Sequence, residues 1–237
     1  MEPITTQPLT QFAMTPLAGQ HIPPGLEYLA QLDQVLIQQI ISLCELLSGC
    51  EAKNKYILKN SMGQEFLTAE EENDFCSRQC CGNIRGFEMP FVDNNGAEVL
   101  RISRPLRCNS CCTPCCNQEM EIFSYGQLLG SMHQEWNFWM PMGTTYTVKN
   151  ASGDRVFTIV APCCPCSCGS DVVFEVIGSE GNVGTIRRTW KGCCTECFTD
   201  ADNFCVTFSL QMDVRHKALI LGAAFLIDFI YFETNQQ

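Results

Sequence analysis

The chain has 237 residues, of which 46% are hydrophobic and 17% are charged, a composition that supplies a core and excludes a largely disordered protein. One large all-β domain can have this length, so we expect a single core. The formal net charge of -11 argues against nucleic acid as a partner and against electrostatic adsorption to anionic lipid, because both need a basic surface.

The 18 cysteines would indicate a disulfide framework in a small secreted domain, but residues 1–20 show no basic start followed by an apolar stretch. We therefore expect no signal peptide, a cytosolic chain and reduced thiols. Reduced cysteines are available for acylation, for metal binding or for burial as small hydrophobic side chains. If the protein sits on a membrane, its net charge requires that something apolar hold it there.

Residues 1–25 are rich in Thr, Gln and Pro, and their lack of apolar periodicity predicts a flexible N-terminal segment. The folded domain is expected over residues 26–237. At its start, apolar residues recur at three- and four-residue steps, which predicts an amphipathic helix over residues 26–47. The residues of this stripe are Leu26, Leu29, Leu32, Leu36, Ile40, Leu43 and Leu47.

After this helix the apolar period changes to two and turn residues recur, which predicts β-hairpins. The hairpins are expected over residues 56–67, 87–102, 119–132, 146–160 and 172–186, and a last strand over residues 204–214. Some eleven short strands in one domain must hide their edges. Closing them into an antiparallel barrel is the most general solution.

The last predicted element is a helix over residues 217–232 that is hydrophobic on every face. Its apolar part is about 15 residues long, shorter than the roughly 20 residues that a membrane-spanning helix needs. The length favours a buried helix wrapped by the barrel, and a tilted span in a thinned bilayer is the alternative. The residues of this buried or membrane helix are Leu219, Ile220, Leu221, Phe225, Leu226, Ile227, Asp228 and Phe229.

Asp228 lies in the middle of this apolar helix. In a bilayer its carboxylate would be energetically unfavourable and therefore a functional candidate. Inside a barrel it would need a partner, such as an arginine or a backbone amide, or it would be held protonated. We favour the structural role over the functional one.

Four segments of the chain are similar, in order and in spacing, to phospholipid scramblases. They are Pro23-Pro24-Gly25-Leu26-Glu27-Tyr28-Leu29, Arg104-Pro105-Leu106-Arg107-Cys108 followed by a cysteine cluster, Thr199-Asp200-Ala201-Asp202-Asn203-Phe204 and Gly222-Ala223-Ala224-Phe225-Leu226-Ile227-Asp228-Phe229. The resemblance covers about residues 23–233. It implies a tubby-like fold, in which a barrel of twelve strands encloses a C-terminal helix. It also implies calcium-stimulated, ATP-independent, bidirectional movement of phospholipids between membrane leaflets.

A cluster of five cysteines carries two interleaved Cys-x2-Cys spacings around Pro114. Its members are Cys108, Cys111, Cys112, Cys115 and Cys116. Spacing alone allows zinc, an iron–sulfur group, lipid or merely buried thiols, and a zinc site would need a second pair of ligands. Candidates for that pair are Cys163, Cys164, Cys166 and Cys168. The resemblance instead implies palmitoylation of the last four members of the cluster, with Thr113 where the family usually has a further cysteine.

The resemblance also places a calcium-binding loop over residues 200–211. The ligating positions that it implies, some through backbone carbonyls, are Asp200, Asp202, Phe204, Val206, Phe208 and Gln211. An EF-hand loop needs glycine at its sixth position and a bidentate carboxylate at its twelfth, where this chain has Cys205 and Gln211. Two carboxylates without a bidentate ligand predict weak affinity. The alternative is a strand preceded by an Asp-rich turn.

Two further clusters each have a functional and a plain interpretation. Arg187, Arg188 and Lys191 lie where the family can carry a nuclear-import signal, but three basic residues along a strand edge are also typical of a solvated face. An aromatic patch is expected to pack in the core, with contact to a membrane interface as the alternative. It consists of Trp136, Phe138, Trp139 and Met140.

The sequence contains no nucleophile–base pair, phosphate loop or metalloprotease signature, so we expect no enzyme. Two functions remain. The first is a phospholipid scramblase, and the second is a palmitoylated signalling or regulatory protein that binds membrane and partner proteins without moving lipid. Either would sit at the cytoplasmic face of the plasma membrane, in contact with phospholipids, and either could form homo-oligomers. The basic residues add a nuclear pool as an alternative location.

Overall fold

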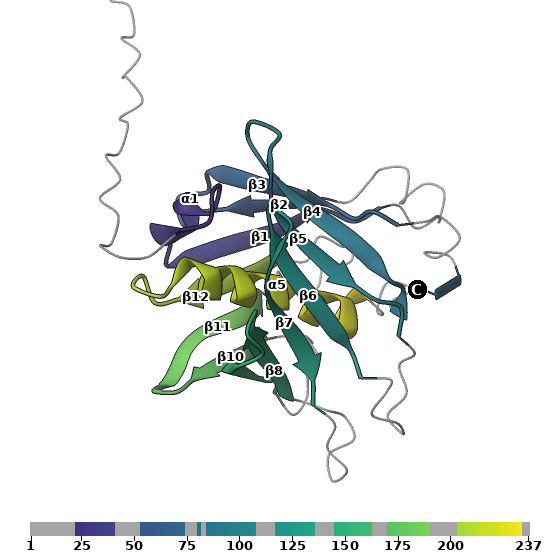
Figure 1. Ribbon diagram of the computed structural model, residues 1–237, viewed down its shortest axis with the longest axis vertical. Helices are drawn as coiled ribbons and strands as arrows, with labels where there is room; N and C mark the ends of the chain where they lie inside the picture. Colours follow the sequence, from purple (N-terminus) through teal and green to yellow (C-terminus); the bar gives the residue numbers. More distant parts are fainter. Residues whose placement is uncertain are drawn as a thin grey trace, which may run out of the picture.

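The computed structural model describes residues 22–40, 53–73, 80–81, 84–107, 117–135, 145–162, 170–189 and 203–233. These residues form a closed barrel of antiparallel strands around a long helix (Figure 1). The predicted fold class, mainly β with an enclosed C-terminal helix, is confirmed. The sequence predicts a flexible N-terminal segment over residues 1–25. Residues 1–21 of it lie outside the described part of the chain.

The barrel contains twelve strands in the circular order β1-β12-β11-β10-β9-β8-β7-β6-β5-β4-β3-β2. Their bounds are β1 (Gln34–Ile40), β2 (Lys55–Lys59), β3 (Glu65–Glu70), β4 (Phe87–Asp93), β5 (Glu98–Arg104), β6 (Glu119–Ser124), β7 (Gln127–Gln134), β8 (Thr145–Asn150), β9 (Arg155–Val160), β10 (Val172–Gly178), β11 (Gly181–Thr189) and β12 (Asn203–Phe208). The helices are α1 (Glu27–Ala30), before β1, and α5 (Val214–Tyr231), after β12.

The barrel closes because the first strand pairs with the last. β1 lies between β12 and β2, so that Ile37 is paired with Phe204 on one side and with Leu58 on the other. Each of the twelve strands therefore has two hydrogen-bonded neighbours. The exposed edges of an open sheet, which promote association with other chains, are removed by this closure.

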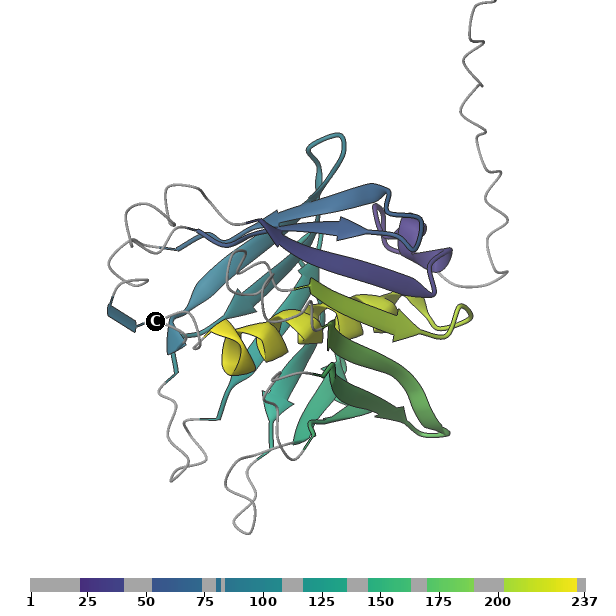
Figure 2. The same ribbon diagram turned by 180° about the vertical axis from the view of Figure 1, so that it is seen from behind.

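Consecutive strands run in opposite directions, so their connections gather at two ends of the barrel. Five short connections lie at one end, which we call the turn end, over residues 60–64, 93–97, 124–127, 150–154 and 178–181. The longer connections between the other consecutive strands begin and finish at the opposite end, which we call the loop end. Figures 1 and 2 show α5 inside the barrel, running between these two ends.

The five predicted hairpins are confirmed, and three of their turns share one construction. The side-chain oxygen of Asn60 accepts hydrogen bonds from the backbone amides of Met62 and Gln64, at 3.0 and 2.9 Å. Asp93 and Asn150 make equivalent pairs of bonds in their own turns. Each turn also has a glycine at positive φ, where a side chain would strain the backbone. The turn residues in the sequence were therefore a reliable signal for the hairpins.

The sequence predicts an amphipathic helix over residues 26–47. For residues 26–40, the part of this range that the structure describes, the prediction is mostly wrong. Only α1 is helical, and it is four residues long. In β1, Val35 and Ile37 are buried in the core, whereas Ile40 is 45% exposed. The apolar residues fit a period of two as well as a helical period. Their β-branched side chains and the two neighbouring strands, which pair with both edges of the segment, favour the strand.

α5 forms the centre of the barrel, as the sequence of residues 217–232 predicts. It is 18 residues long and is buried along most of its length. The ring of Phe225 packs edge-on against the rings of Tyr56 and Phe91, each with its centroid 5.0 Å away. Contacts on every side explain why the helix needs no polar face.

Gly222 lets α5 approach the wall of the barrel closely. A Cβ atom at this position would lie 2.7 Å from Cγ1 of Ile122, a residue of β6, which is closer than two carbon atoms pack. The small residue in the middle of the helix therefore fixes the distance between α5 and β6.

Candidate functional site

Three charged side chains on or directly after α5 make polar contacts with the rest of the chain, and we call them the helix anchors. Lys217 lies in the first turn of α5, Asp228 lies in its last turn, and Glu233 follows the helix. All three are charged residue types beside a long apolar stretch. Their contacts fix the helix near both ends of the barrel.

Lys217 is completely buried near the turn end. Its Nζ donates hydrogen bonds to the backbone carbonyl oxygens of Leu32, Leu210 and Leu29, at 2.6, 2.9 and 3.1 Å. An ammonium group has three donors, so these carbonyls satisfy it. Burial lowers the pKa of Lys217 to about 8. The side chain thereby joins α5 to the chain after α1 and to the turn that precedes α5.

Asp228 contacts the barrel wall through Tyr56, a residue of β2. The Tyr56 hydroxyl donates a 2.8 Å hydrogen bond to Asp228 Oδ2, and both residues are at most 5% exposed. Burial and the neighbouring carboxylate raise the pKa of Tyr56 well above its ordinary value, so the phenol keeps its proton. Asp228 therefore has a hydrogen-bonding partner inside the barrel, as the structural role requires, and Tyr56 supplies one such bond.

Glu233 belongs to a buried polar cluster at the loop end. Arg85, which is 2% exposed, contacts both carboxylate oxygens of Glu71, at 2.5 and 2.9 Å, and forms an ion pair with Glu233. The side-chain amide of Asn54 donates to Glu71 at 2.9 Å and to Glu233 at 2.8 Å. Glu233 is therefore tied to chain segments that precede β2 and β4 and follow β3.

The charges of this cluster perturb one another. Burial raises the pKa of Glu233 to about 7, although the charge of Arg85 opposes the shift. Burial alone would lower the pKa of Arg85, but the bond to Glu71 and the charge of Glu233 raise it above its ordinary value. Arg104, which donates a 2.7 Å hydrogen bond to Gln118, has its pKa lowered to about 10 by burial. The chain directly after α5 thus contains a carboxyl group that titrates near neutral pH.

Sequence reasoning assigned Asp228 a structural role but missed Lys217, Glu233 and Arg85. Lys217 and Glu233 stand at the two ends of the apolar stretch, and charged residues at both ends of an all-apolar helix are a signal that could have found them. Arg85 lies in a segment without periodicity. The sequence offers no sign that it pairs with Glu71, because the contact forms only when β3 and β4, which these residues flank, pair in the folded chain.

β12 carries three of the six predicted calcium positions. Phe204, Val206 and Phe208 point into the core and are 2%, 0% and 4% exposed. Alternate residues of a strand lie about 6.8 Å apart, whereas calcium binds oxygen atoms at about 2.3–2.6 Å. The backbone oxygens of these three residues therefore cannot all reach one ion in this conformation.

The other calcium positions lie on either side of β12. Gln211 is exposed in the turn before α5, and Asp200 and Asp202 lie outside the described residues. The part of the chain that the structure describes brings no three His, Cys, Asp or Glu side chains together for a metal ion. The calcium site stays a prediction, with the condition that at most some of the three positions in β12 can contribute to one ion in this conformation.

Several other predicted site residues lie outside the described ranges. These are the palmitoylation candidates Cys111, Cys112, Cys115 and Cys116, the zinc candidates Cys108, Cys163, Cys164, Cys166 and Cys168, the aromatic residues Trp136, Phe138, Trp139 and Met140, and Trp190 and Lys191 of the basic segment. Acylation, zinc binding and membrane contact by these residues stay predictions.

Two residues of the predicted basic segment are described, and both contact the barrel. Arg187 lies 3.9 Å from Asp171 across the sheet. The guanidinium of Arg188 lies over the ring of Phe232, 4.3 Å from its centroid, at the end of α5. Arg188 therefore packs against the end of α5. Nuclear import through the basic segment stays a prediction.

The structure also bears on whether α5 could span a bilayer. Among the described residues, none of the helices combines the length and the apolar character that a membrane crossing demands.

Comparison with known proteins assigns the chain to a family. The family described as Scramblase matches residues 13–234. Phospholipid scramblase 1 of Mus musculus is 47% identical over 94% of this chain and 68% of its own length. Phospholipid scramblase 1 of Homo sapiens is 48% identical over 90% of this chain and 67% of its own length, and phospholipid scramblase 2 of Bos taurus is 47% identical over 93% and 75%. No solved structure matches the chain. With this match over nearly its whole length, the chain belongs to the phospholipid scramblase family.

Proposed function

We propose that this protein moves phospholipids in both directions between membrane leaflets, with stimulation by calcium and without ATP. The observation that carries the proposal is the 47% identity to a protein named phospholipid scramblase 1 over 94% of the chain. This match includes the barrel and the enclosed helix. The proposal therefore concerns the complete fold and not one short motif.

The enclosed position of α5 restricts how such movement could occur. A head group must cross about 30 Å of hydrocarbon along a polar path. A helix that fills its own barrel does not provide such a path by itself. Lipid movement by this fold requires an oligomer, an opening of the barrel or a local distortion of the bilayer.

Palmitoyl chains on Cys111, Cys112, Cys115 and Cys116 are the proposed membrane attachment, at the cytoplasmic face of the plasma membrane. Each buried methylene adds about 0.8 kcal/mol of membrane affinity, so two or more chains give stable anchoring. The connection that carries these cysteines runs between β5 and β6 and therefore starts and ends at the loop end.

A second function is supported by the helix anchors. Because Lys217 and Glu233 fix α5 at opposite ends of the barrel, the described fold favours a rigid tethered domain over one that inserts its helix. In this alternative the acylated protein binds membrane and partner proteins as a signalling or regulatory component and moves no lipid.

Reconstitution distinguishes the two functions. Purified protein is placed in vesicles with fluorescent phospholipid, and a membrane-impermeant quencher is added outside, with and without calcium. A scramblase lets the quencher bleach the inner leaflet as well, and calcium accelerates the loss. Protection of the inner leaflet at all calcium concentrations contradicts lipid movement and favours the tether.

A variant without the two candidate aspartates tests whether calcium binds at the predicted loop. The double change Asp200→Asn and Asp202→Asn should abolish the calcium acceleration, because it removes both carboxylate ligands. Asp154→Asn, a change of an exposed carboxylate at the turn end, is the matched control and should leave the acceleration intact. Equal responses of the two variants contradict calcium binding at these aspartates.

Membrane attachment is tested in cells by fractionation. Hydroxylamine, which cleaves thioesters, should release the protein from membranes. Replacement of the four candidate cysteines by serine should have the same effect, whereas the changes Cys80→Ser and Cys81→Ser should not. Membrane binding that survives thioester cleavage contradicts the acyl anchor.

A further inference from the structure

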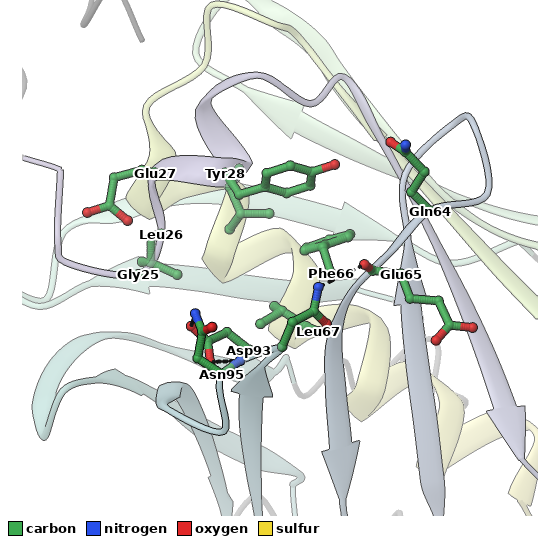
Figure 3. Close-up of a pocket in the computed structure, with 12 residues that line it drawn as sticks. Gly25, Leu26, Glu27, Tyr28, Gln64, Glu65, Phe66, Leu67, Asp93 and Asn95 are labelled. Atoms are coloured by element: carbon green, nitrogen blue, oxygen red, sulfur yellow. Dashed lines mark hydrogen bonds between the residues drawn. The ribbon is translucent and has the colours of Figure 1, made fainter. Parts of the chain in front are cut away.

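A pocket at the turn end is formed by three segments that are distant in the sequence (Figure 3). They are residues 25–29 around α1, residues 64–67 at the start of β3, and residues 93–95 in the turn between β4 and β5. The pocket has a volume of about 440 Å³, which is within the range of about 300–1,000 Å³ for ligand pockets. We call it the turn-end pocket. It lies at the opposite end of the barrel from the ends of β5 and β6 between which the predicted acylation sites occur in the sequence.

The floor of the turn-end pocket is apolar and firmly packed. Leu26, Phe66 and Leu67 are 1%, 8% and 4% exposed. The ring of Tyr28 lies 4.9 Å from that of Phe66, tilted by 37°, and its hydroxyl accepts a 2.8 Å hydrogen bond from Asn60. Figure 3 shows the floor residues of β3 between the α1 segment and the Asp93 turn. The surface therefore exists before any ligand binds.

The rim of the pocket is acidic. Glu27, Glu65 and Asp93 line it, and among the described residues of the lining none is Lys, Arg or His. Backbone amides, first that of Ala97, lower the pKa of Asp93, so its carboxylate stays ionised. Glu65 is 3.4 Å from Lys59, but its side chain is 52% exposed, so the ion pair leaves the carboxylate open to other cations. Together with the chain's net charge of -11, this rim attracts cations.

We propose that the turn-end pocket binds a peptide segment of a partner protein that presents an arginine or lysine beside an apolar side chain. The apolar side chain would pack on the floor, where Tyr28 and Phe66 offer aromatic surface. The cationic group would pair with one of the carboxylates of the rim.

A lipid head group fits the pocket less well. Anionic lipids are repelled by three carboxylates. A zwitterionic lipid would bring its phosphate beside the same carboxylates, and the described part of the pocket lining offers it no basic residue. The inference does not depend on lipid movement or on acylation.

The test uses the full chain in solution and follows its backbone amide resonances by NMR. The probe is the dipeptide acetyl-Phe-Arg-amide, and its matched control is acetyl-Phe-citrulline-amide, in which a neutral urea replaces the guanidinium. We expect saturable shifts of residues around Tyr28, Phe66 and Asn95 with the arginine probe. The citrulline peptide should bind more weakly by up to about fivefold, because it lacks one exposed charge pair.

Variants of the rim locate the binding site. The double change Glu27→Gln and Glu65→Gln should weaken binding of the arginine probe to the level of the citrulline peptide. Both residues lie at the surface, so the fold should survive. Glu180→Gln, which alters an exposed carboxylate of another turn at the same end, should leave the affinity unchanged. Added salt should weaken binding of the arginine probe and not that of the citrulline peptide.

Three results would each overturn the proposal. The first is the absence of saturable shifts, or equal shifts with both peptides. The second is binding of agmatine, a free guanidinium compound, as tightly as the dipeptide, which would point to a small-molecule site. The third is perturbation of the same residues by phosphatidylcholine vesicles without peptide, which would point to a membrane contact.

Discussion

The Tyr56 hydroxyl and the Asp228 carboxylate are joined by a 2.8 Å hydrogen bond, although they stand 172 residues apart in the sequence. The bond connects the second strand of the barrel to the last turn of α5. It stabilises the enclosed position of the helix, because a donor at this place exists only when the barrel surrounds α5. The contact can therefore be used to test whether the helix is enclosed.

The change Tyr56→Phe should lower the free energy of unfolding by about 1–3 kcal/mol, because it removes a donor to a buried carboxylate while keeping the aromatic ring. Urea denaturation measures the effect. Tyr125→Phe, at a tyrosine that is 53% exposed, is the control and should change little. Equal stability of the Tyr56 variant and the unaltered protein would contradict a buried Tyr56–Asp228 contact.

The close approach of Gly222 to Ile122 gives a second prediction. Gly222→Ala should destabilise the protein by about 1–3 kcal/mol, because the added methyl group overpacks the core. Ile122→Ala makes room for the added methyl group. The double variant should therefore lose less stability than the sum of the losses in the two single variants. Strict additivity in denaturant unfolding would show that α5 and β6 are not in contact there.

Lys217→Met should destabilise the protein by about 3 kcal/mol or more, since it leaves several buried carbonyl groups without their donor. The apolar side chain of methionine keeps most of the volume, so the loss reports on the hydrogen bonds. Arg215→Met, an exposed position in the same turn of α5, serves as the comparison and should have a small effect. Comparable unfolding midpoints for the two variants would refute the role assigned to Lys217.

The pKa of Glu233 predicts a pH effect on stability. Burial raises this pKa from 4.5 to about 7, so between these values the folded protein binds more protons than the unfolded chain. Stability contributed by this group is therefore present at low pH and is lost as the pH rises toward 7. Glu233→Gln should flatten the dependence in this window, measured as the unfolding midpoint against pH. An unchanged slope would mean that Glu233 does not titrate there.

Much of the fold could be predicted because its signals are local. Asn60 and Gly63, and their equivalents in other turns, are needed by the turn itself, so the hairpins are visible in the sequence. The apolar run of α5 likewise exceeds what a surface helix would carry. β1 was mistaken for a helix because its apolar spacing fits two periods. Its pairing with β12, far away in the chain, decides between them.

The candidate site was less predictable for the same physical reason. Asp228 is conspicuous in an apolar run, but its partner Tyr56 is one of several tyrosines, and only the closed barrel brings the two together. Arg85 and Glu71 are ordinary charged residues until burial makes them depend on each other. The calcium positions in β12 were implied by the family resemblance, and the extended backbone that separates their oxygen atoms is a property of the folded strand.

The alternation of strand directions has a consequence for how the molecule would stand on a bilayer. All 18 cysteines except Cys205 occur in connections whose flanking strands end at the same pole of the barrel. Fatty chains attached to any of them would draw that pole toward the lipid. The opposite pole, which carries the pocket beside α1, would then face away from the lipid and be accessible to other proteins.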